Sequence, residues 1–152
     1  MIIDELIKSA ILEGNGSKKE AYRAIKNALL KNKTSKNPIK GDEIIYTVNG
    51  ITINKVEYSI LNSLIKQQEE SISIYESNSR NDLAKIERNQ LKYLKELLPE
   101  AISEDRIEEF VVSEYPNGYS KNQMKSVIDS VKKIFPTADG KLIFLVVKSH
   151  IV

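Results

Sequence analysis

The sequence predicts an all-α protein: an N-terminal antiparallel helical bundle with an inserted β-hairpin, followed by a small three-helix C-terminal domain. Through most of the 152 residues, apolar residues recur every three or four positions, which is the spacing of one helix face. Residues that cap or break helices divide this pattern into segments. We expect helices close to 2–13, 18–32, 54–78, 81–97, 103–114, 120–134 and 140–150.

The first two helices are predicted from caps as well as from spacing. The amphipathic pattern of residues 2–12 ends at Glu13-Gly14-Asn15-Gly16, which is typical of a helix C-cap and turn. Ser17 can cap the second helix, with Glu20 at the capping-box position. Basic residues share the side of that helix opposite its apolar face: Lys19, Arg23, Lys26 and Lys33.

A β-hairpin is predicted at about 43–53. β-Branched and aromatic residues flank Asn49-Gly50, and this arrangement is the strongest short signal of a hairpin. Because an isolated two-stranded hairpin is only marginally stable in water, we expect it to pack against the helices or against a partner.

The third and fourth helices are expected to form a hairpin of helices. Asn54 followed by Glu57 has the form of a capping box at the start of the first of them. Ser79 or Asn81 can cap the second, and Pro99 ends it because proline cannot donate an amide hydrogen bond. Its apolar stripe is predicted at Leu83, Ile86, Leu91, Leu94, Leu97 and Leu98.

Arg80 and Asp82 lie at the corner between these two helices. In a structural role, Asp82 would be favoured in the first helical turn by the helix dipole. Arg80 would then tie the corner to carbonyls or carboxylates of the neighbouring helix. A catalytic role would require a nucleophile or base, and none is close in the sequence. We expect the structural role.

The C-terminal part is expected to be a separate domain, with domains at 1–99 and 100–152. Ser103 can cap an acidic helix, and Ser120 can cap the next one. On that second helix, Lys121, Lys125 and Lys132 fall within about 40° of one another at the 100° helical step, away from the apolar face. Lys141, on the last helix, could extend this row.

Composition argues against catalysis by this chain alone. There is no cysteine, which excludes disulfides and thiol catalysis, and the only histidine, His150, is expected to be a solvated surface residue. The sequence has no phosphate-binding or dinucleotide-binding glycine motif. We therefore expect no cofactor, no metal site and no catalytic residue. The start has no signal peptide and no apolar run approaches the roughly 18 residues that cross a bilayer, so we expect a cytoplasmic protein without membrane contact.

The segment from Lys66 to Pro99 resembles the signature of the GatB/YqeY family. It contains Ser71-Ile72, Tyr75, Arg80-Asn81-Asp82-Leu83, Glu87 and Leu98-Pro99. Tyr22–Leu29, Asn122–Lys125 and Ala138-Asp139-Gly140-Lys141 are similar to further motifs of that family. The sequence departs from the signature at Gln68, Ser79, Leu97 and Lys125, where the family has arginine, glycine, tyrosine and glycine.

The resemblance implies a helical protein related to the tail of the B subunit of the tRNA-dependent amidotransferase. That tail is associated with holding tRNA, while other parts of the enzyme, absent from this sequence, carry out the chemistry. The resemblance also implies structural roles for nine residues: Lys66, Ser71, Arg80, Asp82, Leu83, Glu87, Pro99, Asp139 and Gly140.

Three functions remain open. A module that binds tRNA or another structured RNA is favoured by the resemblance and by basic segments, since residues 116–152 hold six basic and two acidic residues. A protein-interaction module is favoured by the acidic segment 100–115 and by the hairpin. A carbon–nitrogen ligase with glutamine as amido-N-donor is disfavoured. The net charge is only +2 and no aromatic residue is expected within a basic cluster, so RNA contacts would be with backbone and shape. The residues expected to make them are Lys19, Arg23, Lys26, Lys121, Lys125, Lys132 and Lys141.

Overall fold

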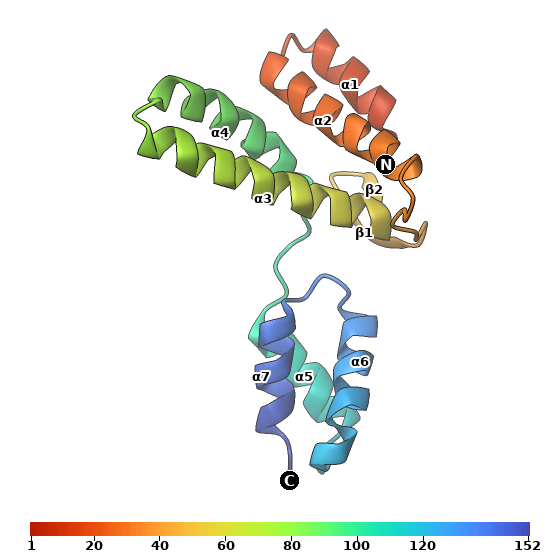
Figure 1. Ribbon diagram of the computed structural model, residues 1–152. Helices are drawn as coiled ribbons and strands as arrows, with labels where there is room; N and C mark the ends of the chain where they lie inside the picture. The colour runs from red at the N-terminus through yellow and green to blue at the C-terminus, as the bar shows by residue number, and fades with distance from the viewer. The chain divides into compact units, whose positions relative to one another are not determined.

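Figure 1 shows the computed structural model of the chain, which describes all residues from Met1 to Val152. It contains seven α-helices, one short 3-10 helix and one two-stranded hairpin. The chain divides into two compact units, Met1–Leu98 and Pro99–Val152. The prediction of an all-α fold with an inserted hairpin is confirmed.

The first unit consists of four helices and the hairpin. The helices are α1 (Ile3–Leu12), α2 (Gly16–Lys33), α3 (Lys55–Ser77) and α4 (Asn81–Lys95). Pairs α1–α2 and α3–α4 pack side by side, and α2 contacts both α3 and α4 (Figure 1). The core holds fully buried alanines at Ala10, Ala21 and Ala84, whose small side chains let the helix backbones approach closely. Ile25 and Leu61 are fully buried in the same core, and burial of each contributes roughly 1.5–3 kcal/mol.

The hairpin forms where it was predicted and is held against the helices. Strands β1 (Ile44–Val48) and β2 (Ile51–Asn54) pair antiparallel, joined by Asn49 and Gly50 at φ 50° and 77°. Both angles are positive, as a type I′ turn requires. Ile53 is fully buried, and the Tyr46 hydroxyl donates a hydrogen bond of 2.8 Å to the carbonyl of Leu97. Burial raises the pKa of Tyr46.

The N-caps of the first unit agree with prediction at one helix and differ at two. At α3, Asn54 and Glu57 form the expected capping box, with both hydrogen bonds at 2.9 Å. The prediction of Ser17 as the α2 cap is wrong, because α2 begins at Gly16 and Asn15 accepts the bond from the amide of Lys18. At α4 the N-cap is Arg80, and no side chain caps the helix there.

Ser79 turns the corner between α3 and α4 with φ of 58°, in the left-handed region that serine rarely adopts. Replacing Ser79 with glycine is expected to raise the free energy of unfolding by about 0.5–1 kcal/mol. The left-handed conformation costs a non-glycine residue roughly 1–2 kcal/mol, and the greater freedom of glycine in the unfolded chain offsets part of the gain. Urea unfolding measures the change.

The matched control for this prediction is Ser73→Gly. Ser73 is exposed within α3 and has a helical backbone, so glycine there should lower the free energy of unfolding by about 0.5 kcal/mol. If Ser79→Gly lost stability as Ser73→Gly does, the corner would carry no strain that glycine relieves.

The second unit packs three helices around an aliphatic core. The helices are α5 (Glu104–Glu114), α6 (Met124–Ile134) and α7 (Gly140–Ser149), and a 3-10 turn at Lys121–Gln123 leads into α6. α7 packs against both α5 and α6. Ser103 caps α5 as predicted, accepting from the amide of Arg106. The fully or almost fully buried side chains are Ile107, Val111, Tyr119, Val127, Val131, Ile143, Val146 and Val147.

The C-terminal residues are fastened to the loop before α6. The amide of Val152 donates to the carbonyl of Tyr119 at 3.0 Å, and the Tyr119 hydroxyl donates to the carbonyl of Val147. The prediction that His150 is a solvated surface residue is wrong. Its Nε2 lies 2.5 Å from Oε1 of Glu108 and its side chain is only 26% exposed, because His150 directly follows α7, which packs against α5.

Candidate nucleic-acid interface

Lys125 and Lys132 of the predicted row lie on the solvent side of α6, whereas Lys121 lies in the 3-10 turn that precedes this helix. Lys121, Lys125 and Lys132 are exposed, whereas Val127 and Val131 of the same segment are buried. None of the three lysines has a carboxylate within the 4.0 Å of an ion pair. Their ammonium groups are therefore free to meet an anionic partner.

A shallow hollow lies on the outer face of this segment, and Lys125 of the row is part of its lining. Lys125 and Lys133 line it together with Asn122, Ser126, Asp129 and Ser130. Hydroxyl and amide groups can bond phosphate oxygens as lysine does. Asp129 opposes an anion here, and at the 100° helical step it lies about 40° from Lys125. The hollow and the one carboxylate within it were not foreseen from the sequence.

Lys141 lies on α7 in a setting that corrects the sequence-based expectation. Lys141, Phe144, Leu145 and Lys148 follow the i, i+3, i+4, i+7 spacing of one helix face. Phe144 is 46% exposed, and the ammonium of Lys148 lies 5.9 Å from the centre of its ring. The expectation that no aromatic residue lies within a basic cluster is therefore wrong. The spacing of these residues in the predicted last helix was the signal that could have revealed the cluster.

The three α2 residues predicted to bind nucleic acid each have an acidic neighbour, unlike the predicted lysines of the second unit. Lys19 and Arg23 lie 3.9 and 3.4 Å from the carboxylate of Glu20. Lys26 lies 2.6 Å from Asp4 of α1. The structure thus separates the predicted nucleic-acid-binding residues into a partly neutralised group on α2 and an unpaired group on α6 and α7.

Arg80 does not tie the helical corner to α3, contrary to expectation. Its guanidinium makes two 3.3 Å contacts with Asp82, two residues along the chain, and both side chains are exposed. The hydrogen bond from Arg80 lowers the pKa of Asp82. The ion pair between α3 and α4 near this corner joins Glu76 to Arg88 at 2.5 Å. The reason is geometric: Arg80 belongs to the turn itself, whereas Arg88 lies two helical turns into α4.

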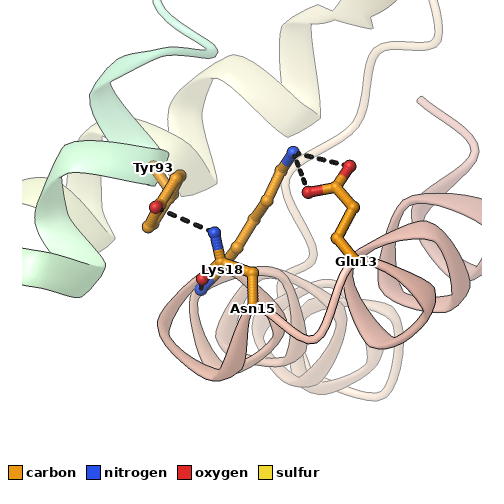
Figure 2. Close-up of polar contacts among 4 residues, drawn as sticks. All are labelled: Glu13, Asn15, Lys18 and Tyr93. Carbon is orange, nitrogen blue, oxygen red and sulfur yellow. Dashed lines mark hydrogen bonds and ion pairs between the residues drawn. The ribbon is translucent and has the colours of Figure 1, made fainter.

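A polar cluster in the first unit joins the turn between α1 and α2 to α4 (Figure 2). The side-chain amide of Asn15 donates to the hydroxyl of Tyr93 at 2.9 Å. The ammonium of Lys18 contacts both carboxylate oxygens of Glu13, at 3.1 and 3.3 Å, and this hydrogen bonding raises the pKa of Lys18. Each group is satisfied by its neighbour, so the cluster fastens helices together. The cluster has no local signature in the sequence, because Asn15 and Tyr93 are 78 positions apart.

The remaining residues that the resemblance marked as structural are distributed over both units. Lys66 is exposed on α3, and Ser71 of the same helix is half-buried, as are Leu83 and Glu87 of α4. Pro99 is the first residue of the second unit. Asp139 caps α7 by accepting from the amide of Lys141 at 2.8 Å, and Gly140 is the first residue of that helix. Asp139 and Gly140 therefore form the start of a helix, whereas Lys66 is an exposed residue within one.

Comparison with known proteins identifies a family for nearly the whole chain. A family model described as Yqey-like protein matches residues 2–151. No curated protein matches the chain.

None of the helices combines the length and the apolar character that crossing a bilayer would need. No three histidine, cysteine, aspartate or glutamate side chains are grouped as a metal site would group them.

Proposed function

Since the chain belongs to the YqeY-like family, we propose that it is a non-catalytic accessory module that binds tRNA or another structured RNA. The contacts would be made by four residues, called here the α6–α7 lysines: Lys121, Lys125, Lys132 and Lys141. The resemblance of the chain to the tail of the tRNA-dependent amidotransferase B subunit suggests the class of partner, and the lysines suggest where it would lie.

The observation that carries the proposal is the difference between the two basic groups. The α2 residues Lys19, Arg23 and Lys26 each lie within 4 Å of a carboxylate, whereas all four α6–α7 lysines are exposed and have none. A paired lysine must give up its carboxylate before it can neutralise a phosphate. An unpaired lysine loses only bound water, so the free energy of phosphate binding should be more favourable at the second group.

The attraction would be local. Residues 99–152 hold seven basic and eight acidic residues, a net charge of −1, and the acidic ones are concentrated on α5. At physiological salt the Debye length is about 8 Å, so charges on another face of the unit are largely screened from a ligand on α6. RNA binding should accordingly be weak, insensitive to sequence and strongly dependent on salt.

A titration of the full chain with purified tRNA at 50, 100 and 200 mM salt tests the proposal. If four lysines each displace a counterion, the logarithm of the association constant should fall against the logarithm of salt with a slope of roughly −3 to −4. That slope corresponds to about 100-fold weaker binding across this range. An association constant that does not change with salt concentration, or no binding at 50 mM salt, would contradict the proposal.

A further inference from the structure

A groove in the first unit lies between the end of α2 and the loop that leads into the hairpin. Its apolar lining comes from Leu29, Pro38, Ile39 and Val56, and Lys33 and Lys40 also line it. Its volume is about 770 Å³, within the range of roughly 300–1,000 Å³ that ligand sites occupy. The groove is separate from the α6–α7 lysines, which belong to the other unit.

The loop that forms the groove is fixed on both sides. The side chain of Asn32 accepts from the amide of Ile39 at 2.9 Å and donates to its carbonyl at 3.1 Å. The amide of Val56 donates to the carbonyl of Gly41 at 3.3 Å. These bonds hold Ile39 in place while its side chain stays 46% exposed. Binding of a partner would therefore cost little conformational entropy in this loop.

The charged residues around the groove are mainly positive. Lys33 and Lys40 line it, Lys36 lies in its loop, and the side chain of Lys55 lies against Gly41 of the lining. None of these lysines has a carboxylate within ion-pair distance. Asp42 is the acidic residue of the lining, and the exposed Glu43 follows it in the loop, so four lysines stand against two carboxylates. An apolar floor with a positive rim complements a ligand with apolar side chains flanked by carboxylates.

We propose that this groove binds a short acidic peptide segment of a partner protein, with large apolar side chains as its anchors. An amphipathic segment places such anchors at i, i+3 and i+4, and carboxylates beside them would meet Lys33 and Lys40. The apolar lining favours a peptide over RNA, because a phosphate backbone would leave Leu29, Ile39 and Val56 without matching contacts.

Selection from a random library of 12-residue peptides displayed on phage, with the full chain as bait, tests this proposal. Enriched peptides should combine Asp or Glu with Leu, Ile or Phe. As synthetic peptides they should bind at least tenfold more weakly to Ile39→Asp and to the double variant Lys33→Glu/Lys40→Glu. Both variants should fold, because the Ile39 side chain is exposed and its backbone makes the bonds to Asn32.

The matched control is Ile86→Asp, which places the same charge on α4 at an isoleucine that is 52% exposed. It should bind the peptides as the unchanged chain does. No enrichment, enriched peptides without acidic residues, or equal binding to Ile39→Asp would overturn the proposal. Displacement of the peptides by tRNA in the Lys121→Glu/Lys125→Glu/Lys132→Glu variant would also overturn it, since the groove would then be an RNA site.

Discussion

Replacing Gly118 with alanine is expected to destabilise the second unit by about 2–4 kcal/mol. Gly118 has φ of 75°, where a side chain costs roughly 1 kcal/mol or more. A Cβ at this position would also lie 2.7 Å from Cγ1 of Val152 and 2.8 Å from the carbonyl oxygen of His150. Relieving such crowding typically costs about 1–3 kcal/mol, and here it would displace the chain end from Tyr119. Urea unfolding followed through the amide signals of Val127 and Val131 measures the loss in this unit.

Substitutions at two other glycines distinguish the cost of the positive φ from the cost of crowding. Gly14 has φ of 71° but open space around its Cβ position, so Gly14→Ala should show the conformational cost alone, roughly 1 kcal/mol. Gly140, at the start of α7, has open space and no positive φ, so Gly140→Ala should be close to neutral within the same unit as Gly118. If Gly118→Ala cost no more than Gly14→Ala, the close approach of Val152 and His150 would contribute nothing.

Local features of the fold could be predicted from the sequence because their partners are close in the chain. The capping box joins Asn54 and Glu57, which are three positions apart, and the turn at Asn49-Gly50 needs only its own backbone angles. Ser17 was chosen as a cap by the same local logic, but Asn15 caps α2 and also bonds the distant Tyr93. That tertiary contact has no counterpart in the local pattern.

The apolar stripe of α4 shows a second limit. Periodicity placed Ile86 in the stripe, yet Ile86 is 52% exposed, whereas Ala84 is fully buried. A buried stripe predicted from large apolar side chains includes isoleucine in preference to alanine. The packed structure favours alanine where neighbouring helices come close, so the buried face is centred nearer Ala84 and Leu91 than the pattern indicated.

For the candidate site, helical geometry was sufficient to predict exposed lysines but not to show which basic residues are paired with carboxylates. The solvent side of α6 follows from the 100° step, and Lys125 and Lys132 lie there, whereas Lys121 is exposed in the 3-10 turn before the helix. The pairing of Lys26 with Asp4 depends on how α1 packs on α2. The peptide groove depends on Asn32 bonding both backbone groups of Ile39. Such contacts arise only when segments separated in the chain meet.

Changing Lys121, Lys125 and Lys132 together to glutamate is expected to weaken tRNA binding by about 100-fold or more at 50 mM salt. The change removes three groups that would neutralise phosphates and adds three that repel them. Each substitution subtracts two charges, so the net charge of the chain falls from +2 to −4. The unit should still fold, because Val127 and Val131 form the buried side of α6 and are unchanged. Gel-shift titration measures binding, and circular dichroism confirms folding.

The control must carry the same change in net charge on another surface. Lys8, Lys31 and Lys85 are exposed in the first unit and have no carboxylate within ion-pair distance, so their joint change to glutamate also gives −4. Because screening confines the attraction to nearby charges, this control should bind tRNA within a few-fold of the unchanged chain. Equal losses in the two triple variants would mean that only total charge matters. Binding untouched by the α6 change would place any RNA contact away from Lys121, Lys125 and Lys132.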